Sequence, residues 1–385
     1  MSRKAVPIRP LLAGVAYGVI LGALLTIGGL KAFGVSFQPQ LSSPEFQKFF
    51  AVYHDLRHLY YQPLSESTLL EAAVNGMVKT TGDPFTDYFT PAAAKSFQNM
   101  LSNSFDGIGV GLKTSQMGFV VASVTPGSPA QRAGLKPNDQ IVKVGDRSVA
   151  GLTMPAVAKL IDGPAGTKVV ITVALLADGG KTHTYTLTRE KISVPAVQVK
   201  LLAHRVGYMQ IVVVGNNSAA EVASGLKQLR AQGATRLILD LRGNPGGYLD
   251  QAKAIAAQFI AQGKVILKVQ NRGQAPQPVV SKGPGLTMPI VVLVDGNTAS
   301  AAEVLAAALR ADDGAKLVGT TTFGKGTVQE TQVFPDGSSL KYTVAHWLTP
   351  DGQWIEHQGL KPDVAIANPN AQLTEAEQVV LQEKP

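Results

Sequence analysis

The chain contains no cysteine, and only 16% of its 385 residues are charged. The absence of cysteine excludes disulfide bonds, thiolate nucleophiles and cysteine-based zinc sites. The histidines form no metal-ligand motif such as H-E-x-x-H, and we interpret His54 and His58, which lack an acidic partner motif, as an exposed pair. We therefore predict no metal site and no cofactor.

Dense basic runs interleaved with aromatic residues are also absent, although the net charge is +8. This pattern argues against nucleic acid as a partner. Positive charges instead flank one apolar segment near the N-terminus, at Arg3, Lys4, Arg9 and Lys31. The hydrophobic fraction of 45% is typical of a folded protein, and the length predicts two or three domains.

The apolar segment runs from Leu11 to Leu30, carries no charge and is long enough to cross a bilayer as a helix. Because the basic side of such a helix stays in the cytoplasm, everything after Lys31 is expected outside it. We predict a signal anchor over residues 1–34, with the folded part in the periplasm or on the cell-envelope side. The alternative is a cleaved signal peptide with Ala32-Phe33-Gly34 as its site, which would give a secreted protein.

Residues 43–104 are helical in character. Ser43-Pro44-Glu45 is typical of a helix start, and further helices are expected over residues 66–80 and 91–101. This region carries no catalytic pattern. We interpret it as a supporting arm, through which copies of the chain could form a homo-oligomer.

Residues 105–189 change to short strands and turns. Gly107-Ile108-Gly109-Val110-Gly111 alternates glycine with apolar residues, and Pro126-Gly-Ser-Pro-Ala130 opens a short helix and turn, so the stretch resembles the PDZ domains of proteases. Such domains add an extended peptide to a sheet edge and hold its terminal carboxylate in a nest of backbone N–H groups. Gly107, Ile108, Gly109 and Val110 are the candidate nest, and a plain strand bend is the alternative.

Strands and helices alternate at crossover spacing from residue 190 to residue 368. This predicts an α/β core with a mainly parallel central sheet and helices packed outside it, followed by a tail over residues 369–385, so the fold class of the chain is mixed α/β. Working groups in such sheets gather at the carboxyl ends of the strands. Three turns are expected there, over residues 243–247, 296–300 and 322–326.

Ser300 has two interpretations. Ser300-Ala-Ala-Glu303 fits the capping box S-x-x-E, which satisfies free N–H groups at a helix start, and the local pattern alone favours this role. The same position suits a nucleophile, because amides at a helix N-terminus can stabilise an oxyanion.

Lys325 follows a glycine-rich bend, with Gln329 four residues further on. A lysine can serve as a base for a serine only if burial lowers its pKa, and most lysines are solvated. The side chain of Gln329 could hold the amine by a hydrogen bond.

Three motifs together favour catalytic roles for Ser300 and Lys325. Asp240-Leu-Arg-Gly-Asn-Pro-Gly-Gly247, Thr298-Ala-Ser-Ala-Ala-Glu303 and Thr322-Phe-Gly-Lys-Gly-Thr-Val-Gln329, in this order behind a PDZ-like domain, resemble the carboxyl-terminal (tail-specific) processing proteases. The resemblance implies a serine endopeptidase that recognises protein substrates by their exposed C-terminal tails.

Carried over by position, the resemblance implies Ser300 as nucleophile, Lys325 as general base and Gln329 as the residue that orients the lysine. It also implies an oxyanion hole from the backbone N–H groups of Gly246 and Ala301. The family often reads S-A-S-A-S-E, whereas this chain has Thr298 and Ala302 in place of the outer serines; the central serine is retained.

Three alternatives remain to be compared with the structure. Residues 319–325 match G-x-x-x-x-G-K of a P-loop, but Gly326 replaces the Mg²⁺-binding Ser or Thr. A Ser-His-Asp hydrolase would use His346 or His357 as its base. The third alternative is an inactive, membrane-anchored PDZ adaptor, against which the presence of all three catalytic side chains argues.

Overall fold

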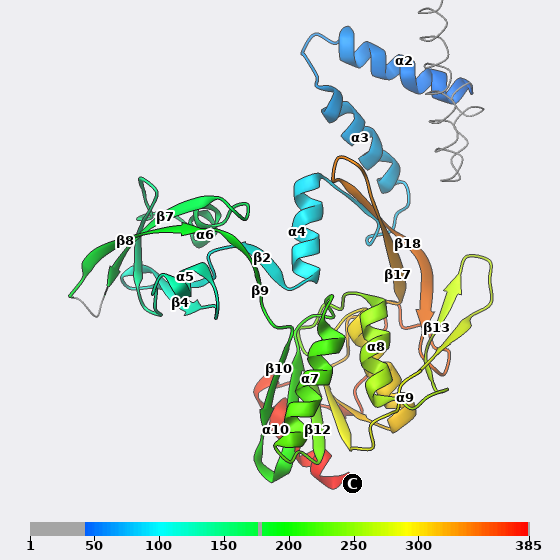
Figure 1. Ribbon diagram of the computed structural model, residues 1–385. Helices are drawn as coiled ribbons and strands as arrows, with labels where there is room; N and C mark the ends of the chain where they lie inside the picture. The colour runs from blue at the N-terminus through cyan, green and yellow to red at the C-terminus, as the bar shows by residue number, and fades with distance from the viewer. Residues whose placement is uncertain (1–42, 176–178, 384–385) are drawn as a thin grey trace, which may run out of the picture. The chain divides into compact units, whose positions relative to one another are not determined.

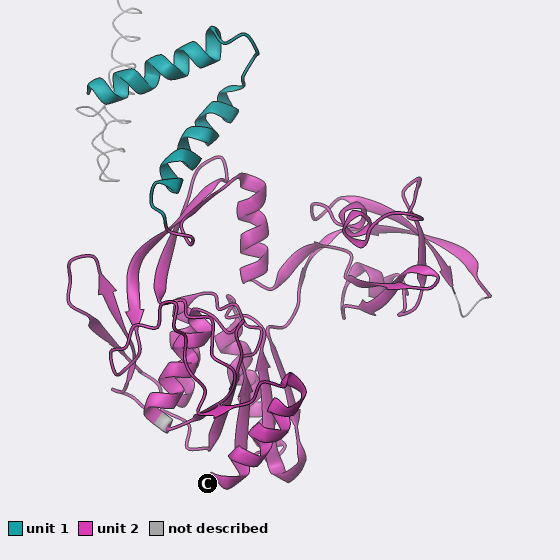
Figure 2. Cartoon of the chain, turned by 180° about the vertical axis from the view of Figure 1, so that it is seen from behind, with its two compact units in different colours: residues 1–82 teal, residues 83–385 magenta. Residues whose placement is uncertain are grey.

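The computed structural model describes residues 43–175 and 179–383, so the predicted anchor over residues 1–34 lies outside them. In the part of the chain that is described, no helix is both long and apolar enough to cross a bilayer. Figure 1 labels the helices and strands. The chain divides into two compact units, Met1–Gly82 and Asp83–Pro385 (Figure 2).

The described part of the first unit consists of helices α2 (Pro44–His58) and α3 (Glu66–Lys79). A serine before each helix accepts a hydrogen bond from a backbone N–H of the first turn, Ser43 from Phe46 and Ser65 from Thr68. Neither helix contains a buried residue. The two helices expected here are therefore present, and their apolar side chains remain accessible.

The second unit contains the third expected helix, α4 (Pro91–Leu101), and then a β-rich domain that is entered and left through the paired strands β2 (Ser104–Gly107) and β9 (Glu190–Ser193). The sheet of this domain has the order β3-β4-β5-β7-β8, with β6 paired to β5, and all its pairings are antiparallel. The elements are β3 (Val110–Ser115), β4 (Gly118–Val124), α5 (Pro129–Arg132), β5 (Gln140–Val144), β6 (Arg147–Ser148), α6 (Met154–Ile161), β7 (Lys168–Leu175) and β8 (Lys181–Thr188).

The β-rich domain has its own apolar core. Val169, Ile171 and Val173 of β7 are buried while the residues between them are not, as the two-residue period of a strand requires. Val157 and Ile161 of α6 complete this core. Strand β3 ends the sheet, so one of its edges has no strand partner in this domain.

Residues 190–368, which are predicted to form the α/β core, contribute strands to two further sheets. The first has the order β10-β11-β12-β15-β16-β19, in which only the β10–β11 pairing is antiparallel. Its strands are β10 (Val197–Leu201), β11 (Val206–Ile211), β12 (Arg236–Asp240), β15 (Ile290–Val294), β16 (Lys316–Gly319) and β19 (Val364–Ala365). A short 3-10 helix, η3 (Ala203–Arg205), precedes β11.

Helices cover both faces of this sheet, which is why all five residues of β15 are buried. Val292 and Val294 pack in one cluster with side chains of α7 (Ser218–Ala231), α8 (Leu249–Phe259) and α9 (Ala301–Asp313). Val291 and Leu293 face the opposite side, where α10 (Pro369–Gln382) supplies Ala376 and Val380. The residues predicted to be a tail therefore form a helix that closes the second face.

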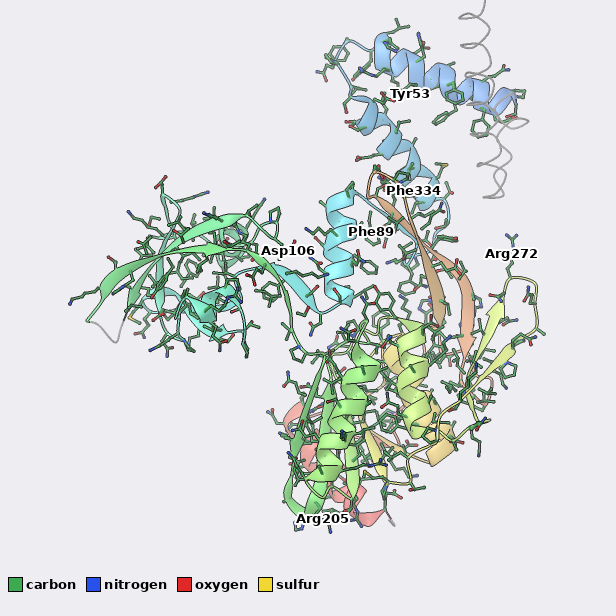
Figure 3. The ribbon with its side chains drawn as sticks, in the orientation of Figure 1. Tyr53, Phe89, Asp106, Arg205, Arg272 and Phe334 are labelled. Atoms are coloured by element: carbon green, nitrogen blue, oxygen red, sulfur yellow. The ribbon has the colours of Figure 1, made fainter. Side chains whose placement is uncertain are left out.

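The second sheet of the core is antiparallel throughout, with the order β1-β18-β13-β14 and β17 paired to β18. Its strands are β1 (Asp87–Phe89), β13 (Val265–Asn271), β14 (Gln277–Val280), β17 (Thr327–Val333) and β18 (Ser339–Leu348). Phe89 lies beside α4, where its ring stacks on Phe97 with centroids 5.1 Å apart (Figure 3). The predicted mainly parallel sheet thus describes only the first sheet, because crossover spacing does not reveal hairpins joined by short turns.

The two-faced packing of the first sheet predicts the stability of two matched variants. Leu293→Ala, at a fully buried position of β15, should lower the free energy of unfolding by about 2–5 kcal/mol, because it removes buried methyl groups and leaves a cavity. Leu201→Ala on β10 of the same sheet, where the side chain is 39% exposed, should cost less than about 1 kcal/mol. Denaturant unfolding measures both, and equal losses would contradict the assignment of the core.

Candidate active site

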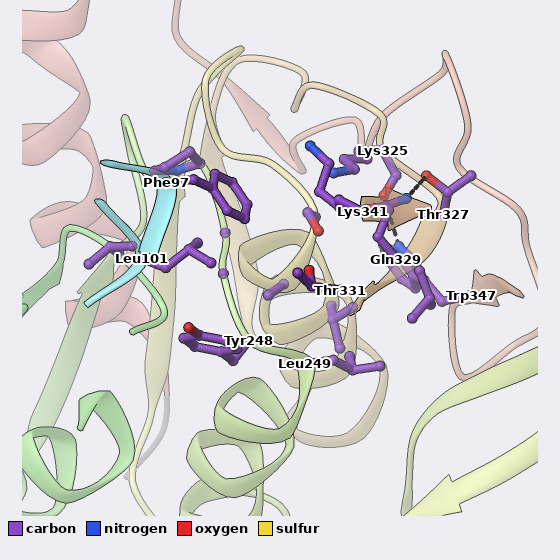
Figure 4. A pocket seen from close by; sticks show the side chains of 18 of the residues that line it. Phe97, Leu101, Tyr248, Leu249, Lys325, Thr327, Gln329, Thr331, Lys341 and Trp347 are labelled. Carbon is purple, nitrogen blue, oxygen red and sulfur yellow. Dashed lines mark hydrogen bonds between the residues drawn. The ribbon is translucent and has the colours of Figure 1, made fainter. Parts of the chain in front are cut away.

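A cavity of about 300 Å³ lies in the second unit (Figure 4). Side chains from α4, α9, β17 and β18 line it, together with the turn that follows β12. The structure brings five of the predicted site residues to this one cavity: Ser300, Lys325, Gln329, Gly246 and Ala301.

Ser300 occupies the turn between β15 and α9 and is the residue that begins the helix. Its backbone has φ 54° and ψ −118°, a conformation that side-chain-bearing residues rarely adopt and that costs free energy. The positive ends of the α9 peptide dipoles lie beside this residue. This backbone differs from the extended conformation usual at an N-cap, although the predicted capping box of Ser300 with Glu303 is present.

Asn244 fastens the neighbouring turn to the serine turn. The side chain of Asn244 is fully buried, and its Nδ2 donates to the backbone carbonyl of Ile211 at 2.8 Å. The backbone carbonyl of Asn244 accepts from the N–H of Ala299 at 2.9 Å. Gly246 has φ 92°, and a Cβ atom there would lie 2.6 Å from the Ala299 carbonyl oxygen. Only glycine fits at this close approach.

The two predicted oxyanion donors differ in their hydrogen bonds. The N–H of Gly246 donates to Oδ1 of Asn244 at 2.9 Å, so it is already occupied. The N–H of Ala301, in the first turn of α9, has no acceptor among the described residues. In this arrangement Ala301 is the donor that is ready for an oxyanion.

Glu303 ties the serine turn to the lysine loop. Its carboxylate is fully buried and accepts from the backbone N–H groups of Ser300 at 2.8 Å, Gly324 at 2.8 Å and Lys325 at 2.9 Å, and from the hydroxyl of Thr322. Burial raises the pKa of the Glu303 carboxyl, and these hydrogen bonds oppose that rise. The predicted capping glutamate is therefore also a cross-link between two loops.

Lys325 is partly buried, and this burial is the largest cause that lowers its pKa, to about 8. Repulsion from Lys341 lowers the pKa further, whereas the negative charges of Asp83, Glu356 and Glu303 raise it. A lysine with this pKa is neutral in roughly a tenth of the molecules at pH 7. Burial therefore lowers the pKa of Lys325, as its predicted role as a base requires.

The backbone of the lysine loop is fixed from several sides. The indole N–H of Trp347 donates to the carbonyl of Lys325 at 2.8 Å, and that of Trp354 to the carbonyl of Gly326 at 3.2 Å. The N–H of Gly326 donates to Glu356 at 2.6 Å. The lysine side chain is held differently, with Nζ 4.5 Å from the ring centroid of Phe85.

No hydrogen bond joins Lys325 Nζ to Ser300 or to Gln329 in the described part of the chain. Gln329 donates from Nε2 to the hydroxyls of Thr327 at 2.8 Å and Thr343 at 3.2 Å, and Thr343 donates to Asp83 at 2.5 Å. The structure therefore places the predicted catalytic side chains in one cavity without assembling the bonds between them.

The predicted carboxylate nest lies in the β-rich domain, apart from this cavity. Ile108 points its side chain into the domain core, and its carbonyl accepts from Ala130 at 2.9 Å. Gly109 has φ 82°, and a Cβ atom there would lie 2.3 Å from Cβ of Ser128, so this position also requires glycine. No contact tests the binding role of Gly107, Ile108, Gly109 and Val110, which stays a prediction.

The alternative catalytic arrangements receive no geometric support. Neither His346, whose ring stacks on Trp354, nor His357, whose side chain is 83% exposed, lines the cavity. Residues 320–326 lead from β16 into β17 with no intervening helix, whereas a P-loop opens into a helix. His54 and His58 are exposed, with ring centroids 4.9 Å apart.

Sequence reasoning missed Phe85, Lys341 and the cross-linking role of Glu303. An acidic residue amid the alanines of α9 was the one available signal for Glu303, since a charge in so apolar a helix needs buried partners. Thr298, which departs from the serine pattern of the family, keeps a buried hydroxyl that donates to the carbonyl of Leu241 at 2.9 Å. A serine at this position also carries a hydroxyl that could make this hydrogen bond.

Comparisons with known protein families match three parts of the chain. Residues 205–366 match peptidase family S41, residues 120–175 match a PDZ domain, and residues 33–92 match the N-terminal domain of the activating protease CtpB. The matched PDZ range begins after the candidate nest.

Individual relatives show the same pattern. The carboxy-terminal processing protease CtpA of Bacillus subtilis is 38% identical over 327 residues, which are 85% of this chain and 70% of the relative. A protein of Staphylococcus aureus named as a CtpA-like serine protease is 39% identical over 83% of this chain, which spans 64% of that longer protein. A solved structure of an S41 protease from Bacteroides fragilis shares the fold, with a TM-score of 0.53 at 17% identity over 85% of this chain and 92% of that one.

The cross-link through Glu303 predicts a loss of stability on a small change. Glu303→Gln replaces one acceptor oxygen by an N–H₂ group that faces backbone donors, so the free energy of unfolding should fall by about 2–4 kcal/mol. The same exchange at Glu330, which is exposed on β17, should change it by less than about 0.5 kcal/mol. Denaturant unfolding of both variants is the measurement, and an unchanged midpoint for Glu303→Gln would refute the cross-link.

Proposed function

Because the chain belongs to peptidase family S41 and is a serine-type peptidase, we propose that it cleaves proteins by acyl-enzyme chemistry with Ser300 and Lys325 as a dyad. The observation that carries this proposal is the cavity that both side chains line, one on a strained turn at a helix start and the other with a lowered pKa.

The reaction begins with neutral Lys325, which takes the proton from the Ser300 hydroxyl as its Oγ attacks the peptide carbonyl. The N–H of Ala301 and the N-terminus of α9 stabilise the resulting oxyanion, and the N–H of Gly246 joins them once it leaves Asn244. The lysine ammonium then gives its proton to the leaving amine. Water, deprotonated by the same lysine, finally releases the acyl group and restores the serine.

The dyad requires a hydrogen bond between Lys325 Nζ and Ser300 Oγ, so the lysine must move from the face of Phe85 before the chemistry starts. Gln329 can then orient the amine only if it exchanges a threonine partner for Lys325. Substrate binding in the cavity is the event that we propose to favour this exchange.

The substrates that we propose are proteins with exposed C-terminal tails, in keeping with the carboxy-terminal processing protease among the relatives. The PDZ-like domain would capture the tail by pairing it with the open edge of β3, with its carboxylate at residues 107–110. A membrane anchor over residues 1–34 would keep the peptidase on the extracytoplasmic side, in the periplasm or cell envelope. The helical arm is the surface proposed for a homo-oligomer.

Replacement of the two dyad residues tests the proposed function. Ser300→Ala and Lys325→Ala should each lower the rate of cleavage of an unstructured protein by at least about a thousandfold, because each removes one half of the nucleophile. Ser148→Ala, at an exposed position of β6, should leave the rate unchanged. Electrophoresis of the substrate over time measures the rates. Equal substrate survival with wild type and Ser300→Ala would favour the inactive adaptor, and full activity of Lys325→Ala would end the dyad proposal.

The lowered pKa of Lys325 predicts how activity depends on pH. Because the neutral amine is the active form, kcat/KM should rise with pH through a midpoint of about 8 and reach a plateau above it. At pH 7 the rate should be roughly a tenth of that plateau. A pH series with a peptide that contains no titrating group is the measurement, and a flat profile from acid to alkaline pH would contradict Lys325 as the base.

A further inference from the structure

A second lysine, Lys341, shares the cavity with Lys325 (Figure 4). It lies on β18, opposite Thr331 of β17, and its side chain is only 15% exposed. Neither motif reasoning nor the proposed mechanism gives this side chain a role. Two cationic groups in one partly buried cavity repel each other, so an ammonium kept at this position needs an explanation.

The surroundings of Lys341 hold its charge in place. Its Nζ lies 5.1 Å from the ring centroid of Phe89 and 5.0 Å from that of Phe97, and these two rings stack on each other. Aromatic faces attract a cation through their quadrupole. The remaining partner is Asp87, 3.3 Å from Nζ, whose side chain is 51% exposed.

The ion pair with Asp87 does not account for this placement. A half-exposed carboxylate is screened by water, and such pairs contribute little to stability. The two rings and the low exposure instead direct the positive charge into the space that Lys325 occupies.

We propose that Lys341 is a positioning residue for the catalytic base, whose fixed positive charge favours the neutral amine of Lys325 over its ammonium. The inference rests on the proposed role of Lys325. The cavity wall, through β18 and the stacked rings of β1 and α4, then adds to burial in favouring the neutral amine on which the reaction depends.

Charges on every element around Lys325 bear on this proposal. Asp83 precedes β1, Glu303 lies on α9 and Glu356 follows β18, and all three favour the ammonium. Burial and Lys341 act in the opposite direction, and Lys341 is the one positive charge among these groups. Without Lys341 three carboxylates would act on the amine with no cation to oppose them, and burial would be the remaining cause of neutrality.

Removal of the charge at constant side-chain size tests the proposal. In the full-length protein, Lys341→Met should move the midpoint of the kcat/KM profile upward by about half to one pH unit, which lowers the rate at pH 7 about three- to tenfold. The plateau at alkaline pH should be retained. Lys341→Arg, which keeps the charge, should restore the profile. Lys268→Met, on β13 of the same sheet but outside the cavity, should leave it unchanged.

A second readout separates this inference from the proposed dyad. Acetylation of Lys325 by acetic anhydride, followed by mass spectrometry of peptides across a pH series, gives the titration of this amine without any need for catalysis. An upward move of that titration in Lys341→Met supports the inference. Unchanged midpoints in both readouts, or a plateau lowered equally by Met and Arg, would mean a packing role and overturn it.

Two further outcomes are decisive. If Lys325→Ala keeps full activity, the dyad fails and Lys341 has no base to position, even if acetylation still detects the repulsion. If Lys341→Met does not fold, as thermal unfolding would reveal, Lys341→Gln carries the same two measurements and the same criteria, since it also removes the charge and has an unbranched aliphatic stem.

Discussion

The buried carboxylate of Glu303 is the constraint on which the rest of the site depends. A charge removed from water must find hydrogen-bond partners, and Glu303 finds them on the serine turn and on the lysine loop, which are more than twenty residues apart in sequence. These loops therefore have one relative position in the folded chain. Ser300 and Lys325 share a cavity because the turn and the loop that carry them are both bonded to this acid.

The two sheets of the core contribute different parts of that cavity. The parallel sheet delivers the serine turn and the turn of Gly246 at the carboxyl ends of β15 and β12, as open α/β sheets generally do. The antiparallel sheet provides Gln329 and Lys341, and Lys341 is the one positive charge among the groups that act on Lys325.

Local patterns were sufficient for part of this description. The apolar run of β15, the alanine-rich α9 and the glycine-rich turns are encoded over a few residues each, and the edge at which the turns meet follows from parallel pairing. The Phe85 ring beside Lys325 and the stacked rings of Phe89 and Phe97 beside Lys341 come from segments far apart in sequence from these lysines. No period or motif carries such contacts, because they arise only when separate elements pack.

The proposed capture of a tail at the unpaired edge of β3 has a consequence for which proteins can become substrates. A segment can join that edge only as an extended strand with its own N–H and C=O groups unsatisfied, so a C-terminus wound into a helix or already paired in a sheet must first be released. The free energy of this local unfolding depends on the substrate, and it makes the binding free energy of the tail less favourable by the same amount. Two proteins with identical C-terminal residues would then be cleaved at different rates, according to how often the C-terminal segment of each unfolds.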